Sequence, residues 1–220
     1  TLYLLTGFWS ALVGTGFSFH IRLNLAQPGG VYSHLPQLYN VVVTSHALIM
    51  IFFFVMPTMM GGFGNWLLPL LMGNRDLVFP RVNNMSYWVL PGPLFMILIS
   101  GVIEGGAGTG WTLYPPLSSV VFHSSPGVDL VIFALHIAGF GSIMSSMNFM
   151  SSVVGGRFSN LIPERLPIFI WSIFVSSWLL LFSLPVLAGG LTMLITDRHV
   201  NSAFFIPMGG GDPVLFQHLF

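Results

Sequence analysis

Cysteine is absent from all 220 residues of the chain. Disulfide bridges, thiolate zinc sites and cysteine nucleophiles are therefore excluded within this sequence, and a metal would have to be held by histidine, carboxylate, methionine or backbone oxygen. Lysine is absent too, and six arginines balance six acidic residues. This balance gives neither the basic footprint of a nucleic-acid-binding protein nor an acidic tail, so nucleic acid is not an expected partner.

Charged residues of either sign are scarce. They make up 5% of the chain, against about 25% in a typical soluble domain, while 54% of the residues are apolar. So few charges cannot cover a surface that faces water, and the rest of the surface must face lipid. We therefore predict an all-α, polytopic transmembrane helix bundle in a lipid bilayer.

Five stretches are long and apolar enough to cross a bilayer, which takes about 20 residues per helix. They lie near residues 2–21, 41–72, 85–103, 129–154 and 167–195, and we treat residues 1–220 as a single membrane domain. The second stretch is longer than a span requires, so a tilt or a kink near Pro57 is expected. The start of a sixth helix is expected near Asp212 and Pro213, because an acid before a proline is typical of a helix start. Both ends of the chain look cut, so we expect a fragment of a longer protein.

The arginines indicate an orientation in the membrane. The connections after the second and fourth stretches hold Arg75, Arg81, Arg157 and Arg165, whereas the alternate connections hold only Arg22 and Arg198. Because positively charged loops stay on the side of insertion, we expect the side with four arginines, and the N-terminus, to be the inner side.

His46 is the first candidate for chemistry, since it lies several residues inside the second stretch with no charge nearby. An imidazole in such surroundings is expected to be neutral, and its free lone pair suits a metal or a haem iron. A histidine in a helix also serves often as a hydrogen-bonding packing residue. From the residues alone both interpretations stay open, as they do for His136, whose glycine-rich and serine-rich setting suits a helix contact.

The connection from Glu104 to Pro116 is the most specific-looking stretch of the chain. Its glycines do not indicate a nucleotide site, because no lysine with serine or threonine follows and no strand precedes. We interpret it as a tight lid over the end of the bundle, in which glycine permits a close backbone approach and Trp111 and Tyr114 offer rings with one polar edge. An ordinary belt of interfacial aromatic residues is the equal alternative.

Polar residues recur near the inner ends of the second and third stretches, among them Asn65, Asp76, Asn83 and Ser86. Such residues are costly against lipid but useful along a file of water, which Ser142 and Asn148 of the fourth stretch would continue. Taken alone, Asp76 beside Arg75 is interpreted more simply as a solvated loop pair. The sequence shows no Ser-His-Asp or paired-carboxylate arrangement, so soluble hydrolase chemistry is not supported.

Seven motifs resemble, in order and spacing, those of the catalytic subunit of the respiratory haem-copper oxidases, most of all the mitochondrial members of that family. They are VTSH at residues 43–46, GGFGNW at 61–66, FPRVNN at 79–84, GAGTGWTLYPP at 106–116, LPVLA at 184–188, TDR at 196–198 and GGGDP at 209–213. The resemblance implies part of a twelve-helix bundle in the mitochondrial inner membrane. It also implies a proton-pumping oxidoreductase complex of several subunits, which reduces dioxygen to water with electrons from cytochrome c.

The same resemblance implies roles for single residues. His46 matches one axial ligand of the haem a iron, Arg22 matches the arginine that binds the formyl group of that haem, and Trp111 matches the tryptophan beside its propionates. Asp76 matches the mouth of a proton path, which overrides the solvated-pair interpretation. The positions that line this path are matched by Asn65, Asn83, Ser86, Tyr3, Ser142 and Asn148.

Other features limit what the chain is expected to do. Asn24 stands where the family often has an acid, which puts an outer cation site in doubt, and Gly141 stands where many members have serine. The resemblance puts the ligands of haem a3 and copper B beyond Phe220, so this chain alone is expected to be inactive. A quinol-type haem-copper oxidase and a non-redox membrane transporter are the alternatives to a cytochrome c oxidase.

Overall fold

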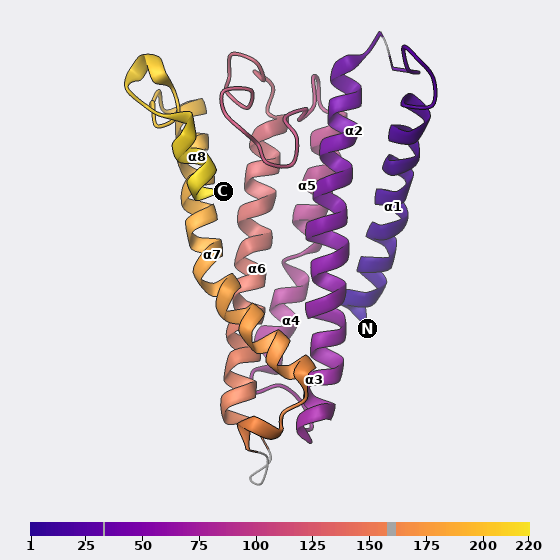
Figure 1. The fold of residues 1–220 in the computed structure, drawn as a ribbon, viewed down its shortest axis with the longest axis vertical. Helices are drawn as coiled ribbons and strands as arrows, with labels where there is room; N and C mark the ends of the chain where they lie inside the picture. The colour runs from indigo at the N-terminus through magenta and orange to yellow at the C-terminus, as the bar shows by residue number, and fades with distance from the viewer. Residues whose placement is uncertain (33, 158–161) are drawn as a thin grey trace.

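The computed structural model describes residues 1–32, 34–157 and 162–220 of the chain. Within these residues all regular secondary structure is helical (Figure 1). The α-helices are α1 (Leu2–Asn24), α2 (Pro36–Leu48), α3 (Asn65–Met72), α4 (Pro80–Trp88), α5 (Pro91–Val102), α6 (Gly127–Gly155), α7 (Ile168–His199) and α8 (Pro213–Leu219). Two π-helical segments, η1 (Ile49–Val55) and η2 (Pro57–Gly64), join α2 to α3, and η3 (Pro163–Arg165) and η4 (Pro207–Gly209) are single 3₁₀ turns.

Five of the helical runs are long and apolar enough to cross a membrane, which confirms the predicted polytopic helix bundle. They are Leu2–Asn24, Pro36–Met72, Pro80–Val102, Gly127–Gly155 and Ile168–His199. Each overlaps one of the stretches expected from hydropathy. That the described residues form a single domain stays a prediction.

The observed helices differ from the expected stretches mainly at their starts. The second and third runs begin at Pro36 and Pro80, several residues before the apolar sequence does. Proline suits the first turn of a helix, because its fixed φ is helical and its missing N–H would have no partner there anyway. Hydropathy does not detect this signal, so the expected starts were late. α8 begins where expected, and the Asp212 carboxylate caps it by accepting the Val214 N–H at 2.9 Å.

The irregularity expected near Pro57 takes the form of the two π-helical segments. Pro57 has no N–H to donate within the helix, so the usual hydrogen-bond ladder is interrupted at this residue. On either side of Met56 the turns are wider than those of an α-helix. Wide turns of this kind are rare and are often found at functional sites.

α6 lies at the centre of the described bundle and packs against α4, α5 and α7, while α1 packs along α2, η1 and η2 at one edge (Figure 1). A larger apolar core joins η1, α5, α6, α7 and α8, and a smaller one joins α3 to α6 and α7. Two glycines of η2 allow α1 to pack closely against that segment, because a Cβ atom on Gly61 or Gly62 would collide with Tyr3 or Leu4 of α1.

The loops fall at two ends of the bundle (Figure 1). The connection after α1, the long connection between α5 and α6, and the connection after α7 lie at one end, which we call the lid end. The connection between α3 and α4 lies at the opposite end, which we call the Asp76 end after the acid that it carries. These two ends hold the two sets of candidate residues.

Candidate functional site

His46 lies in α2, half-buried, with its ring turned toward α1. Its Nδ1 atom lies 2.8 Å from the carbonyl oxygen of Gly14. A carbonyl oxygen can only accept, so Nδ1 carries the ring proton and Nε2 keeps a free lone pair. No hydrogen-bond partner of Nε2 occurs in the part of the chain that the structure describes. A second ring nitrogen held by a backbone carbonyl is the usual support of a histidine that binds a metal.

Gly14 is the residue that permits this contact. A Cβ atom at position 14 would collide with the side chain of Met50, one turn after His46. α1 and α2 therefore pack closely at the position that orients the imidazole.

The connection between α5 and α6, residues 103–126, lies across the start of α2, and we call it the lid loop. The Gly110 N–H donates to Thr44 Oγ1 at 2.9 Å, two residues before His46. The Gln37 amide donates to the Gly105 carbonyl at 2.8 Å. Gly106 has a φ of +58°, and a Cβ atom there would meet Val41. The close backbone approach predicted for this loop is thus made onto α2.

Two aromatic residues of the lid loop contact α8. The Trp111 ring is 41% exposed and lies edge to face with Phe220, with ring centroids 5.7 Å apart. The Tyr114 hydroxyl accepts a hydrogen bond of 2.8 Å from the Gln217 amide. Arg22, in the last turn of α1, is exposed at the same end. His46, Arg22 and Trp111 therefore all lie toward the lid end, although no direct contact joins them among the described side chains.

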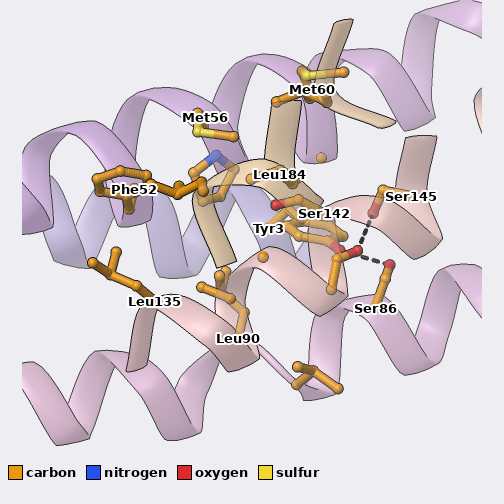
Figure 2. A pocket seen from close by; sticks show the side chains of 18 residues that line it. Tyr3, Phe52, Met56, Met60, Ser86, Leu90, Leu135, Ser142, Ser145 and Leu184 are labelled. Carbon is orange, nitrogen blue, oxygen red and sulfur yellow. Dashed lines mark hydrogen bonds between the residues drawn. The ribbon is translucent and has the colours of Figure 1, made fainter. Parts of the chain in front are cut away.

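A cavity of about 50 Å³ lies between α1, η1, η2, α4, α6 and α7, and a tyrosine and three serines line it among mostly apolar residues (Figure 2). The Tyr3 hydroxyl lies 2.8 Å from Ser86 Oγ and also hydrogen bonds with Ser145 (Figure 2). Ser86 Oγ donates to the Asn83 carbonyl at 2.7 Å, and Ser142 also lines the cavity. A water needs roughly 10–15 Å³ of such space, so the ≈ 50 Å³ cavity has room for about three.

Asn65 lies next to η2, toward the Asp76 end. Its amide nitrogen donates to the Gly61 carbonyl at 2.6 Å, and its side-chain oxygen is buried without a partner among the described atoms. Buried oxygens of this kind are normally satisfied by ordered water. Asn65 itself does not line the cavity, although its partner Gly61 does.

Asp76 is exposed, and its carboxylate accepts the N–H of Leu77 at 2.7 Å. The salt bridges found among the described residues do not include Arg75 with Asp76. Arg75 is exposed as well, so both neighbours lie at the surface of the loop without a direct ion pair.

Asn148 has a different place from the other path candidates. It is 1% exposed, and its side-chain amide binds the backbone of Phe79 twice, accepting its N–H and donating to its carbonyl, both at 3.1 Å. It holds the connection between α3 and α4, residues 73–79, which we call the Asp76 loop. Asn148 is not among the residues that line the cavity.

His136 joins α6 to α7. Its Nε2 atom lies 3.1 Å from Thr192 Oγ1, and its Nδ1 atom lies 2.9 Å from the carbonyl oxygen of Ile132. Both ring nitrogens are engaged, which fits the helix-contact interpretation of this residue.

One buried cluster escaped sequence reasoning. Arg198 at the end of α7 and Asp129 at the start of α6 form a buried salt bridge with a distance of 2.6 Å. The available signal was the presence of two opposite charges at the ends of apolar stretches, since charges in such places usually pair with one another.

Taken together, these features define a class: a multi-pass helical membrane protein with a histidine that has a free ring nitrogen toward one end and a small cavity with several hydroxyl groups toward the other. The chain belongs to the family described as cytochrome c and quinol oxidase polypeptide I, because the sequence model of that family matches residues 1–220. This membership implies haem and copper cofactors in general.

Curated relatives agree along the whole chain. It is 49% identical over 220 residues to cytochrome c oxidase subunit 1 of Mytilus edulis, 50% identical over 220 residues to that of Yarrowia lipolytica and 51% identical over 221 residues to that of Pecten maximus. All of this chain is covered in each case, but only 40%, 41% and 46% of the relatives. The chain therefore spans less than half the length of these curated relatives.

Proposed function

We propose that the chain is part of the catalytic subunit of a cytochrome c oxidase. The complete subunit, with its partner subunits, would reduce dioxygen to water with electrons from cytochrome c and would move protons across the mitochondrial inner membrane. The names of the relatives and the family match support this proposal. The single observation that carries it is the half-buried His46 imidazole with Nε2 free and Nδ1 held by Gly14.

In this proposal His46 Nε2 would bind the iron of haem a. Bound haem a supplies one-electron chemistry, because its iron changes between two oxidation states. The Gly14 carbonyl fixes the tautomer and the orientation of the ring, which raises the basicity of the ligand. Arg22 would bind the formyl group and Trp111 would lie beside the propionates. Haem a3 and copper B belong to segments of the relatives that this chain does not span.

The polar residues toward the Asp76 end form the proposed proton path. Asp76 collects protons at the surface, and Asn65 and Asn83 lie on the route inward. Ser86 donates its own proton to the Asn83 carbonyl, so Tyr3 donates to Ser86 and offers its oxygen to the cavity. Waters beside Tyr3, Ser142 and Ser145 would continue the path. Asn148 contributes by holding the Asp76 loop.

A quinol-type oxidase is the second candidate, because the description of the matching family includes quinol oxidases. The three relatives above are all named for cytochrome c, which favours that donor. A non-redox transporter has no such support.

The haem assignment is tested by His46→Leu in the complete subunit. Loss of the imidazole proposed to bind the iron is expected to remove or alter the low-spin haem band in a reduced-minus-oxidised spectrum. His136→Leu is the matched control, since His136 is also a histidine within a span but has both ring nitrogens engaged. An unchanged band in His46→Leu would reject the assignment.

The proton path is tested by Asp76→Asn in the assembled enzyme. The amide cannot carry a proton at the surface, so proton pumping or turnover is expected to be lost. Glu164→Gln, an exposed acid in η3, is the control for a change of surface charge. Full pumping by Asp76→Asn would reject the entry role.

A further inference from the structure

Arg198 has every one of its donors engaged. Its Nε and Nη2 atoms bind the two carboxylate oxygens of Asp129 at 2.6 and 3.2 Å. Its Nη1 atom donates to the carbonyls of Ser118 and His123 at 2.7 and 2.9 Å, and Nη2 also donates to the carbonyl of Ser125 at 3.1 Å. These are five bonds for the five N–H donors of a guanidinium, and the side chain is 1% exposed.

Three of the five acceptors belong to the lid loop. One side chain at the end of α7 therefore fixes the backbone of this loop at Ser118, His123 and Ser125. Asp129, at the start of α6, supplies the neutralising charge, and His199 Nε2 approaches the same carboxylate at 2.9 Å from the exposed side.

The lid loop is held to α2 on its other side. His123 Nδ1 donates to the Leu117 carbonyl at 2.7 Å, so its Nε2 is an acceptor, and the Gln37 amide reaches it at 3.1 Å. The second proton of the same amide goes to Gly105. A continuous chain of contacts thus runs from Arg198 through His123 and Gln37 to the start of α2, two turns and a half before His46.

The backbone hydrogen bonds within the lid loop join residues only three or four positions apart, so they form local turns without placing the loop as a whole. Gly105, Gly106 and Gly110 have positive φ values of 76°, 58° and 77°. Glycine is the residue that adopts such angles without strain, but it also leaves the unfolded loop many alternative conformations. The position of Trp111, directly after Gly110, therefore depends on the tethers at both sides of the loop.

We propose that Arg198 and Asp129 are positioning residues, which fix the lid loop and through it Trp111 over the end of the bundle where His46 lies. This inference rests on the proposed function, since Trp111 and His46 are there placed beside the same haem. The pair does not touch the haem in this proposal. It acts on the haem indirectly, because it holds the lid loop that carries Trp111.

Arg198→Lys in the complete oxidase tests this role. Lysine keeps the charge but has three donors, so two or more of the five bonds are lost. Amide hydrogen exchange at residues 105–125 is expected to become at least about 10-fold faster, because local opening governs this exchange. In the same enzyme the low-spin haem band or its midpoint potential is expected to shift, while the haem content per enzyme stays unchanged. Arg165→Lys, exposed in η3 at the opposite end, is expected to change neither.

Asp129→Asn is the second variant, chosen because the side chain keeps its shape and Arg198 keeps its three carbonyl acceptors. Faster amide exchange at residues 105–125 and a shift of the low-spin haem band or its midpoint potential are expected here too. Glu104→Gln is its control, because Glu104 is an exposed acid of the lid loop with no hydrogen bond or ion pair among the described residues, and it should leave both readouts unchanged.

Wild-type exchange in the lid loop of both variants would overturn the inference. So would a faster exchange that leaves the haem band and potential unchanged, since the pair would then stabilise the loop without positioning anything at the haem. Failure of the proposed function gives a different result: the His46→Leu spectrum would be unchanged, whatever the exchange of the lid loop shows.

Discussion

The two ends of the bundle hold their loops by different chemistry. At the lid end, the Arg198 guanidinium binds three backbone carbonyls and needs the Asp129 carboxylate beside it. At the Asp76 end, the neutral amide of Asn148 binds both polar groups of Phe79 without any counter-ion. Hydrogen bonds from a charged donor are stronger, but a buried charge becomes very costly when its partner is removed.

This difference fits the tasks proposed for the two ends. The lid loop is expected to hold the Trp111 ring in one place beside a haem. A charged cluster in which every donor of Arg198 has an acceptor suits that task. The other end is expected to admit protons and water. The same half of the bundle holds the cavity with its hydroxyl groups and the buried Asn65 oxygen, which has no partner among the described atoms. The comparison predicts that the lid end is rigid and intolerant of change, and that the Asp76 end is more adaptable.

The largest expected effect is that of Arg198→Leu. It leaves the Asp129 carboxylate, which is 9% exposed, with only the exposed His199 beside it. Breaking a buried pair in this way costs about 3–5 kcal/mol of stability. Denaturant unfolding of the assembled oxidase in detergent measures the loss.

Arg165→Leu is the control for this variant, because Arg165 is exposed and should change stability by no more than about 0.5 kcal/mol. Equal and small effects of the two arginine variants would remove the contrast between the ends. The double variant Arg198→Leu with Asp129→Leu is expected to recover part of the loss, since no uncompensated charge then remains.

A smaller effect is expected from Asn148→Leu at the other end. The apolar side chain has a similar size but leaves the N–H and the carbonyl of Phe79 without their partner, at a cost of about 1–3 kcal/mol. The same unfolding measurement applies. Asn84→Leu is the control, because Asn84 is exposed on the neighbouring helix α4. A loss as large as that of Arg198→Leu would show that the neutral tether is no more adaptable than the charged one.

The sequence predicted the membrane helices well, because a bilayer imposes its thickness on every span. It predicted less about the tethers. Asp129 and Arg198 are 69 positions apart, and nothing local indicates that they pair. The partners of Arg198 in the lid loop, like the partner of His46 on α1, are backbone carbonyls, which every residue has and which therefore leave no mark in a sequence.

Asn148 shows a related limit. Its residue type and its place in an apolar stretch predicted a polar face along a water file, whereas the structure directs its amide to Phe79. An asparagine bound to a loop and one that faces water look alike in sequence. Tyr3 and Ser86, in contrast, do lie at the cavity; the run of polar residues already indicated Ser86, whereas Tyr3 was implied only by the resemblance.

The smallest effect on stability, and the sharpest test of the adaptable end, is expected from Tyr3→Phe. The change removes the hydroxyl that bonds to Ser86 and Ser145 and keeps the ring that packs against Tyr87. A single hydrogen bond contributes about 0.5–1.5 kcal/mol, and water in the cavity can replace part of it. Proton uptake by the assembled enzyme, followed with a pH indicator during single turnover, is nevertheless expected to slow.

Tyr87→Phe makes this test discriminating. The Tyr87 hydroxyl lies 2.8 Å from Thr6 Oγ1, so it joins the same two helices, α1 and α4, by a bond as long as that between Tyr3 and Ser86. It does not line the cavity. Both variants lose a link between α1 and α4, and Tyr3→Phe also loses the bond to Ser145, so Tyr87→Phe should lose no more stability than Tyr3→Phe. Only Tyr3→Phe should slow proton uptake. Equal slowing by both would mean that the hydroxyls act by holding α1 in place, and the cavity would then have no part in carrying protons.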